Sequence, residues 1–206
     1  TPSPDFAPSE LCSNDHEEDS WRATLRYASQ MHTGEVSYTN TSTDRSFLTQ
    51  GVSTFATEGE LEEFSYLGNW KVRDDLHIVY GADLRNEAID DGVVDTDRDQ
   101  NGYYLEYQGG FNDSFFVTAG ARYDDNDDFG SETTYRLSGA YLIPAGDGEV
   151  KLKTTYGTGF RAPSVSEIAY NNSFSAFPPA LGLELSAEKS EGFDLGAGYY
   201  ANSGWY

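Results

Sequence analysis

The chain has little of what marks several common protein classes. Among its 206 residues there is one cysteine, so no disulfide can form within it. There is no run near the ~20 apolar residues that a membrane helix needs. Only 13 basic residues stand against 35 acidic ones, for a net charge of −22, and nucleic-acid binding calls for a basic surface. Disulfide scaffolds, helical membrane proteins and nucleic-acid-binding proteins are therefore excluded.

Residues that would support catalysis are also scarce. The three histidines, His16, His32 and His77, are scattered, and no H-x-x-x-H pair or Cys/His cluster accompanies them. The G-x-S-x-G nucleophile elbow of the α/β-hydrolases is missing as well. We therefore expect a protein that is not an enzyme.

The single cysteine, Cys12, lies in a polar stretch near the start of the chain. Two interpretations fit it: a loop disulfide to a residue upstream of Thr1, or a free thiol. No signal peptide is present, and Thr1 opens directly into polar sequence. We therefore expect the natural N-terminus to be missing.

The most informative pattern is a series of segments in which apolar and polar residues alternate, joined by connections that are short and long in turn. Connections of a few residues alternate with long ones at 41–59, 88–101, 124–131 and 160–187. This rhythm is typical of an up-and-down transmembrane barrel, which has short turns on the periplasmic side and long loops outside. It predicts an all-β fold: a fragment of a transmembrane antiparallel up-and-down β-barrel, in which about nine strands cannot close an even-stranded wall. The predicted strands are 21–29, 34–42, 60–70, 75–87, 102–110, 114–124, 132–143, 149–159 and 188–201.

The two faces of these strands differ in polarity. Successive side chains of a strand point to opposite faces, and a cation that faces lipid at mid-depth costs about 2–4 kcal/mol. Trp70, Tyr123 and Tyr156 lie near strand ends, as interfacial aromatics do. A half-buried antiparallel sheet in water would show the same alternation and stays open as an alternative. In the strands 21–29, 75–87, 114–124, 132–143 and 149–159, every cation falls on the polar face, which we assign to the lumen: Arg22, Arg26, Arg85, Arg122, Arg136, Lys151 and Lys153.

Acidic residues are concentrated in the long connections. Asp95, Asp97, Asp99 and Asn101 partly match the ligand spacing of an EF-hand calcium loop, but Gln100 occupies the position where that loop needs glycine. Two interpretations remain: a solvated loop kept soluble by its charge, or a calcium site.

Three ordered motifs resemble the TonB-dependent outer-membrane receptors. Residues 120–130 read G-A-R-Y-D-D-N-D-D-F-G, and residues 156–164 read Y-G-T-G-F-R-A-P-S. Glu188 and Lys189 then begin an E-K-S motif. Residues 181–186 depart from the family's N-P-x-L-x-P segment. The pattern is most similar to the members that take up cobalamin or ferric siderophores.

The resemblance implies a barrel of about 22 strands filled by an N-terminal plug. Residues 1–206 would then belong to the barrel domain, with the plug domain absent. The implied function is import of a scarce metal chelate, cobalamin or a ferric siderophore, across the outer membrane of a Gram-negative bacterium. The implied partners are outer-membrane lipid, the chelate, and TonB, which would act through the missing N-terminal region and supply the energy. Two alternatives remain: a passive porin-type barrel, and a soluble, acidic, calcium-binding β-sandwich.

Within the second motif, most residues have a structural interpretation. Gly157 and Gly159 permit a kink near the rim, beside Phe160. Pro163 ends strand pairing and precedes the one stretch expected to be helical, about a turn at 164–169. Arg161 needs a carboxylate or phosphate partner.

The long connection that follows is better placed to bind a ligand. Its aromatic rings and amides suit a large planar or cyclic molecule, although the aromatics could instead pack the loop against its neighbours. Together with the acidic connections at 90–101 and 124–128 it is expected to form the mouth of the barrel. The candidate ligand-binding residues are Tyr170, Asn171, Asn172, Phe174 and Phe177.

Overall fold

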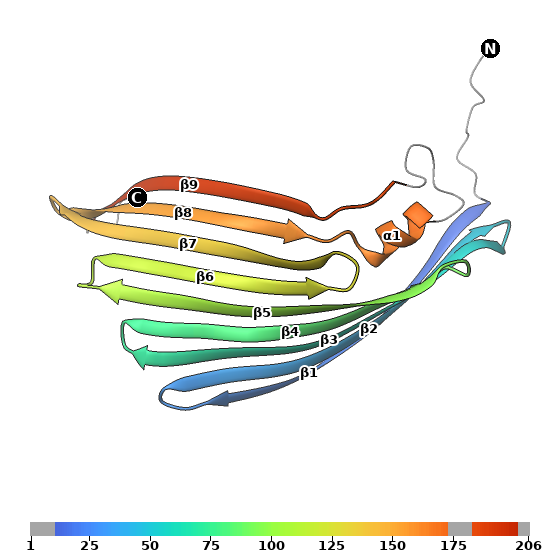
Figure 1. Cartoon of the computed structure of the whole chain (residues 1–206), viewed down its shortest axis with the longest axis horizontal. Coiled ribbons are helices and arrows are strands. Elements are labelled where there is room, and N and C mark those ends of the chain that lie inside the picture. Colours follow the sequence, from blue (N-terminus) through green and yellow to red (C-terminus); the bar gives the residue numbers. More distant parts are fainter. Residues whose placement is uncertain (1–10, 173–182, 202–206) are drawn as a thin grey trace, which may run out of the picture.

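A computed structural model describes residues 11–172 and 183–201 and shows one nine-stranded sheet with a single helix (Figure 1). The strands follow one another in chain order, each antiparallel to the next. This arrangement confirms the all-β, up-and-down prediction, and a single sheet is not the two packed layers of a sandwich. The elements are β1 (Cys12–Ala28), β2 (His32–Thr49), β3 (Val52–Arg73), β4 (Leu76–Asp90), β5 (Asp95–Phe111), β6 (Phe115–Asn126), β7 (Gly130–Ala145), β8 (Gly148–Arg161), α1 (Val165–Asn172) and β9 (Glu188–Ala201).

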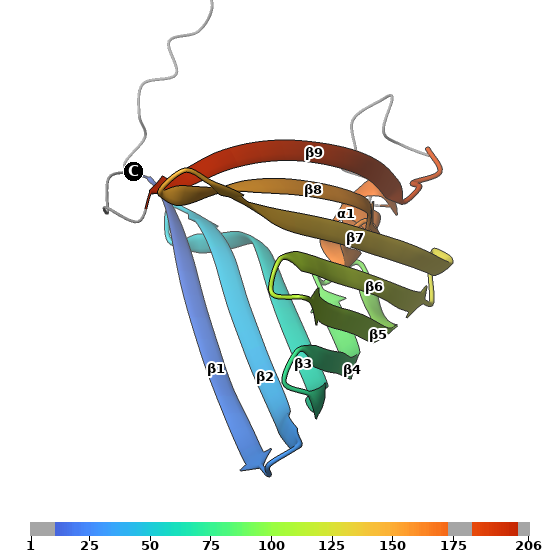
Figure 2. The ribbon, with the colours of Figure 1, turned by 90° about the vertical axis from the view of Figure 1, so that its left-hand side faces the viewer.

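The sheet is curved and open, with β1 and β9 as its edges and α1 inside the curve (Figures 1 and 2). Tight turns join most neighbouring strands. Gln50 and Gly51 have φ values of 54° and 75°, the left-handed pair that a type I′ turn requires, and this turn matches the natural twist of a hairpin. Asn112 and Asp113 form the same kind of pair, each with φ 53°.

The prediction of long irregular loops is wrong for three of the four connections. β2 and β3 remain paired as far as Thr49 and Val52, so only two residues turn where residues 41–59 were expected to form a loop. The connections after β4 and β6 shrink in the same way to 91–94 and 127–129. A strand needs ~9–11 residues to cross a membrane, whereas β3 has 22. The hairpins therefore extend beyond that length as paired strands.

The physical reason is that backbone pairing continues where the apolar alternation stops. Outside lipid, neither face of a hairpin has to be apolar, so the sequence signal disappears while the hydrogen bonds persist. β1 illustrates the point, because it begins at Cys12 and not near residue 21. Within the described residues Cys12 is an exposed free thiol, 3.9 Å from Thr49 Oγ1.

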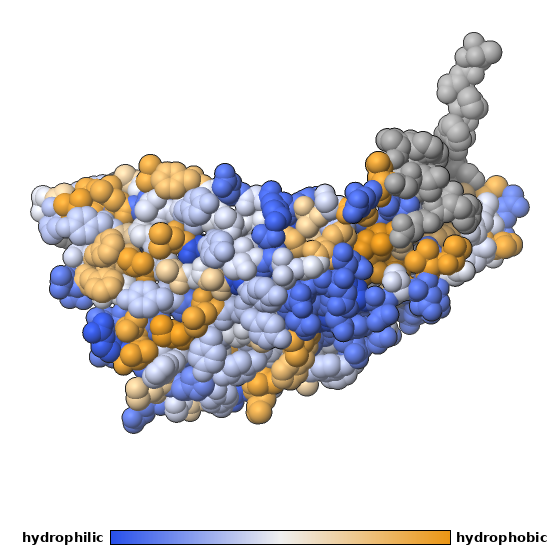
Figure 3. All heavy atoms as spheres, viewed as in Figure 1, coloured by the Kyte–Doolittle hydropathy of each residue, from blue (hydrophilic) through white to orange (hydrophobic). Residues whose placement is uncertain are grey.

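The register confirms the assignment of faces. The side that carries α1, called the inner face below, also carries all seven strand cations assigned to the lumen, since the pairing of β1 through β8 places them on the same side as Arg98. The outer face exposes large apolar side chains, including Leu25 (69%), Leu105 (58%) and Leu195 (75%). Hydrophobic residues are also visible over much of the surface in Figure 3, while a hydrophilic patch lies beside α1.

A single layer cannot bury such a face against itself. In the described part of the chain the only buried hydrophobic residues are Val165 and Ala169, both in α1. No helix within that part is long and apolar enough to cross a membrane. An exposed apolar outer face of this kind requires a covering that the sheet does not supply.

Candidate functional site

Helix α1 bridges the inner face of the sheet. The chain leaves β8 at Arg161, yet α1 contacts β4 and β5, so its path crosses the inner side of β6 and β7. Val165 and Ala169, one turn apart, form its buried side. The helix thus occupies the inside of the curve at the end of the sheet where the β4–β5 and β6–β7 turns also lie (Figures 1 and 2).

The start of α1 is a capping box. The Glu167 N–H donates to Ser164 Oγ at 3.2 Å, and the Ser164 N–H donates to Glu167 Oε2 at 2.7 Å. This reciprocal pair satisfies two backbone donors that the first turn of a helix leaves open. The Ser164 N–H and the Arg161 guanidinium lower the pKa of Glu167 to about 2.

Arg161 joins this cap to the neighbouring strand. Its Nη2 donates to both carboxylate oxygens of Glu167 at 2.9 Å, and its Nη1 donates to Glu188 Oε1 at 3.0 Å. The second sequence motif and the E-K-S motif are therefore in contact through one guanidinium. Lys189 in turn forms an ion pair with Glu132 of β7.

Gly157 and Gly159 lie where β8 separates from β7. Pairing of β7 with β8 ends at Gly157, whereas β8 stays paired with β9 as far as Arg161. A Cβ on Gly159 would lie 2.6 Å from Ser190 Oγ, so a side chain at this position would displace the Ser190 hydroxyl. Phe160 pairs with Lys189 in the same ladder.

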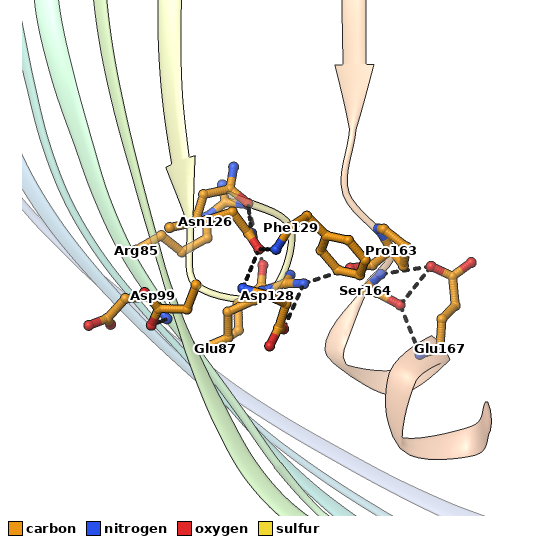
Figure 4. Close-up of polar contacts among 12 residues, drawn as sticks. Arg85, Glu87, Asp99, Asn126, Asp128, Phe129, Pro163, Ser164 and Glu167 are labelled. Atoms are coloured by element: carbon orange, nitrogen blue, oxygen red, sulfur yellow. Dashed lines mark hydrogen bonds and ion pairs between the residues drawn. The ribbon is translucent and has the colours of Figure 1, made fainter. Parts of the chain in front are cut away.

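A second guanidinium, from β5, holds the chain just before α1. Arg98 of β5 is 4% exposed, and its Nη1 donates to the Pro163 carbonyl at 2.6 Å. Figure 4 labels Glu87, Asp128 and Pro163, which surround this contact. Its Nη2 donates to Glu87 Oε2 at 2.6 Å, and Asp128 of the β6–β7 turn lies 3.8 Å from Nη1. Arg98 therefore joins β4, the β6–β7 turn and the residue before the helix cap.

Further ion pairs continue from Arg98 along the inner face. Arg85 lies 2.7 Å from Glu63 and 3.5 Å from Glu87. Arg122 bridges Asp83 at 2.7 Å and Asp124 at 2.9 Å. The guanidinium of Arg122 lies over Gly102, where a side chain would overlap it. These part-buried pairs fix the inner wall beneath α1.

The inner face of β7 and β8 differs in how its cations are paired. Arg136, Lys151 and Lys153 line a hollow of about 380 Å³ together with Glu106. Within residues 11–172 and 183–201, none of these three cations forms an ion pair, whereas the inner-face arginines of β1, β4, β5 and β6 all do. This part of the wall therefore carries three cations that have no ion-pair partner among the described residues, beside the carboxylate of Glu106.

The residues predicted to bind a ligand differ in exposure and in their contacts, and two of the five lie outside the described part of the chain. Tyr170 is 49% exposed on α1. Asn171 is buried, and its Nδ2 donates to the Leu183 carbonyl at 2.8 Å, so this amide ties down the returning chain. Asn172 is the last residue of α1. Phe174 and Phe177 lie outside the described residues.

The predicted calcium residues are not in a loop. Asp95, Asp97, Asp99 and Asn101 lie in strand β5, where they alternate with Arg98 and so project from the outer face, away from α1. Asp99 Oδ1 accepts a hydrogen bond from Asn86 on the adjacent strand at 2.8 Å. Among the described residues no three His, Cys, Asp or Glu side chains are grouped to hold a metal. Calcium binding stays a prediction, but the expected loop is wrong.

Arg98 and Glu87 were not among the site residues predicted from the sequence. Arg98 fell in the predicted acidic connection 88–101 and Glu87 at the end of the predicted strand 75–87, so neither residue was assigned a partner. The signal that could have identified Arg98 is its position between Asp97 and Asp99. If this D-R-D run is a strand, the arginine is the one charged residue that faces inward.

Comparison with known proteins places the chain in a family. The family model described as TonB dependent receptor-like, beta-barrel, matches residues 10–206. The chain belongs to this receptor family. Its resemblance to TonB-dependent receptors at the level of motifs is thereby confirmed.

Individual members of the TonB-dependent receptor family match parts of the chain. Vitamin B12 transporter BtuB of Vibrio cholerae is 26% identical over 144 residues, which is 66% of this chain and 21% of that protein. BtuB of Vibrio vulnificus is 28% identical over 120 residues, or 54% of this chain and 19% of that protein. The chain thus spans about a fifth of the length of these relatives.

A solved structure shows the same fold. The crystal structure of the siderophore receptor PirA from Pseudomonas aeruginosa matches with a TM-score of 0.77 over 93% of this chain and 38% of that one. Sequence identity is 18%, so the likeness concerns the fold alone. The open nine-stranded sheet is accordingly part of a receptor barrel.

Proposed function

We propose that the chain is part of the wall of an outer-membrane receptor that imports a metal chelate, cobalamin or a ferric siderophore, using energy supplied through TonB. Family membership supports this role, as do relatives whose names refer to vitamin B12 transport and to a siderophore receptor. In the complete protein, the rest of the barrel and a plug would close the lumen that this sheet borders.

The observation that carries the proposal is the helix held across the inner face. A passive pore keeps a water-filled lumen, whereas the start of α1 is held inside the curve by Arg98 of β5 and Arg161 of β8. Its exposed Tyr170 provides an aromatic surface at the end of the barrel that carries the longer hairpins. An aromatic ring among polar groups suits a large, partly planar ligand.

The outer face supports the proposed location. Leu25, Leu105 and Leu195 are exposed on a sheet that has no second layer among its described residues. Lipid would cover these side chains, while the paired charges remain on the inner face. The net charge of −22 fits hairpins that project into water beyond the membrane.

The test is uptake and binding by the complete receptor. Purified receptor is titrated with cyanocobalamin and with ferric siderophores, and uptake of each ligand is followed in cells with and without TonB. We expect saturable binding of one ligand class and uptake that stops without TonB. Nonsaturable, TonB-independent permeation of small solutes would instead indicate a passive porin.

A further inference from the structure

Arg98 has an unusual position for an arginine of an extended hairpin. It is 4% exposed, although both flanking residues, Asp97 and Asp99, are exposed on the opposite face. Burying a cation is costly unless it is paired and hydrogen-bonded. Within the described residues its Nε–H has no partner, which adds to that cost. The contacts made by its two Nη atoms must therefore offset the cost of burying the guanidinium.

Those contacts connect segments that are far apart in the chain. The Pro163 carbonyl, which accepts from Arg98 Nη1 at 2.6 Å, belongs to the residue just before the Ser164 cap. Arg98 and Pro163 are 65 residues apart in sequence. Because that carbonyl lies at the start of α1, its bond to β5 determines where the helix begins across the inner face.

We propose that Arg98 is a positioning residue for ligand capture, which fixes the first turn of α1 over the lumen and thereby sets the place of Tyr170. The ligand-binding part of this inference rests on the function proposed above. Arg161 anchors the helix to β8 and β9, where the chain leaves the wall. Arg98 supplies the second anchor, so the start of α1 is held from β5 as well as from β8 and β9.

Geometry explains why arginine is required. One guanidinium reaches the Pro163 carbonyl and the Glu87 carboxylate through two different Nη atoms. A lysine ammonium offers a single nitrogen on a flexible stem and cannot reproduce this fork. Lysine should therefore restore the charge beside Glu87 and only part of the positioning.

The position of α1 can be measured without any ligand. In the complete receptor carrying Cys12→Ser, spin labels are attached to cysteines introduced at Ser166 on α1 and at Asp44 on β2, both exposed. The distance distribution is expected to be narrow in the parent. It should broaden with Arg98→Gln, broaden less with Arg98→Lys, and stay narrow with Arg45→Gln, a matched change on a hairpin arginine that contacts Asn14 and Phe47.

Binding of cyanocobalamin or of a ferric siderophore, whichever the parent receptor binds, gives the second readout in the same variants. If the correctly placed helix falls to about a tenth of the molecules, the apparent Kd rises about tenfold. We expect that loss for Arg98→Gln, partial recovery for Arg98→Lys, and parental affinity for Arg45→Gln. An unchanged distance distribution in Arg98→Gln would overturn the positioning role, and broadening without loss of affinity would overturn its part in capture.

Two further controls keep these outcomes separate. If Arg98→Gln fails to assemble, Glu87→Gln tests the same link, because it removes the carboxylate that orients the Arg98 guanidinium toward the Pro163 carbonyl, and it should broaden the distribution as well. A narrow distribution in that variant would contradict the proposal. If the parent receptor binds no chelate while Arg98→Gln still broadens the distances, the proposed function fails and the positioning of α1 by Arg98 stands.

Discussion

At the scale of single residues, ion pairs and hydrogen bonds fix the start of α1, and a glycine leaves space for an arginine side chain on the inner face of the sheet. Arg161, Glu167 and Ser164 form one connected cap at the start of α1. Gly102 leaves space for the Arg122 guanidinium on the inner face, where it bridges two carboxylates. The cap leads to a prediction about pH dependence, and Gly102 leads to a prediction about stability.

The cap should give α1 a specific dependence on pH. The pKa of Glu167 is lowered in the folded state to about 2, so its contribution is fully present above the unfolded value of about 4.3 and is lost as the pH falls toward 2. A spin label at Ser166 should therefore become more mobile between about pH 4.3 and 2. Glu167→Gln should remove that transition, whereas Glu184→Gln, an exposed position of the same connection, should keep it. An unaltered transition in Glu167→Gln would show that another group controls the helix.

The space at Gly102 should be essential to the inner wall. Gly102→Ala would place a methyl group on the Arg122 guanidinium and disturb its pairs with Asp83 and Asp124. We expect a loss of about 1–3 kcal/mol in the free energy of unfolding of the complete receptor, measured by urea titration in detergent. Gly192→Ala, where nothing lies within 4 Å of the added Cβ, is the control and should be close to neutral. Equal effects of the two substitutions would refute this role for Gly102.

At the scale of elements, the sequence predicts strands well and their ends poorly. β9 matches its predicted limits of 188–201, because it carries alternation to both ends. β2 and β3 extend far beyond theirs, since hairpins in water keep their backbone hydrogen bonds without an apolar face. The helix at α1 was expected from Pro163 and Ser164. Its bridge to Arg98 could not be, because that contact depends on how the sheet curves.

The two faces of a strand should respond oppositely to a new charge. Leu105→Lys on the outer face of β5 would place a cation in lipid, which costs about 2–4 kcal/mol at mid-depth. Gln108→Lys on the inner face of the same strand keeps a donor for Glu106, which now accepts from Gln108 at 2.6 Å. We expect Leu105→Lys to reduce the heat-resistant folded form in outer-membrane fractions and Gln108→Lys to leave it at the parental level. The reverse order would invert the assignment of faces.

At the scale of the whole molecule, this is a wall and not a self-contained domain. The described residues form one layer whose only buried hydrophobic side chains belong to α1. Its stability must therefore come from lipid on the outer face and from neighbouring strands at the β1 and β9 edges. In isolation such a sheet should aggregate, which is why each test above uses the complete receptor.

The most direct test of the account is the sidedness of its two ends. The β5–β6 turn at Asn112 lies at the end opposite to Asp97 and Asp127, which belong to the end where α1 lies. In intact cells producing the Cys12→Ser receptor, single cysteines at these three exposed positions are treated with a membrane-impermeant maleimide. The account predicts rapid labelling at Asp97 and Asp127, and labelling at Asn112 only after the outer membrane is permeabilised. Comparable labelling of Asn112 in intact cells would contradict it.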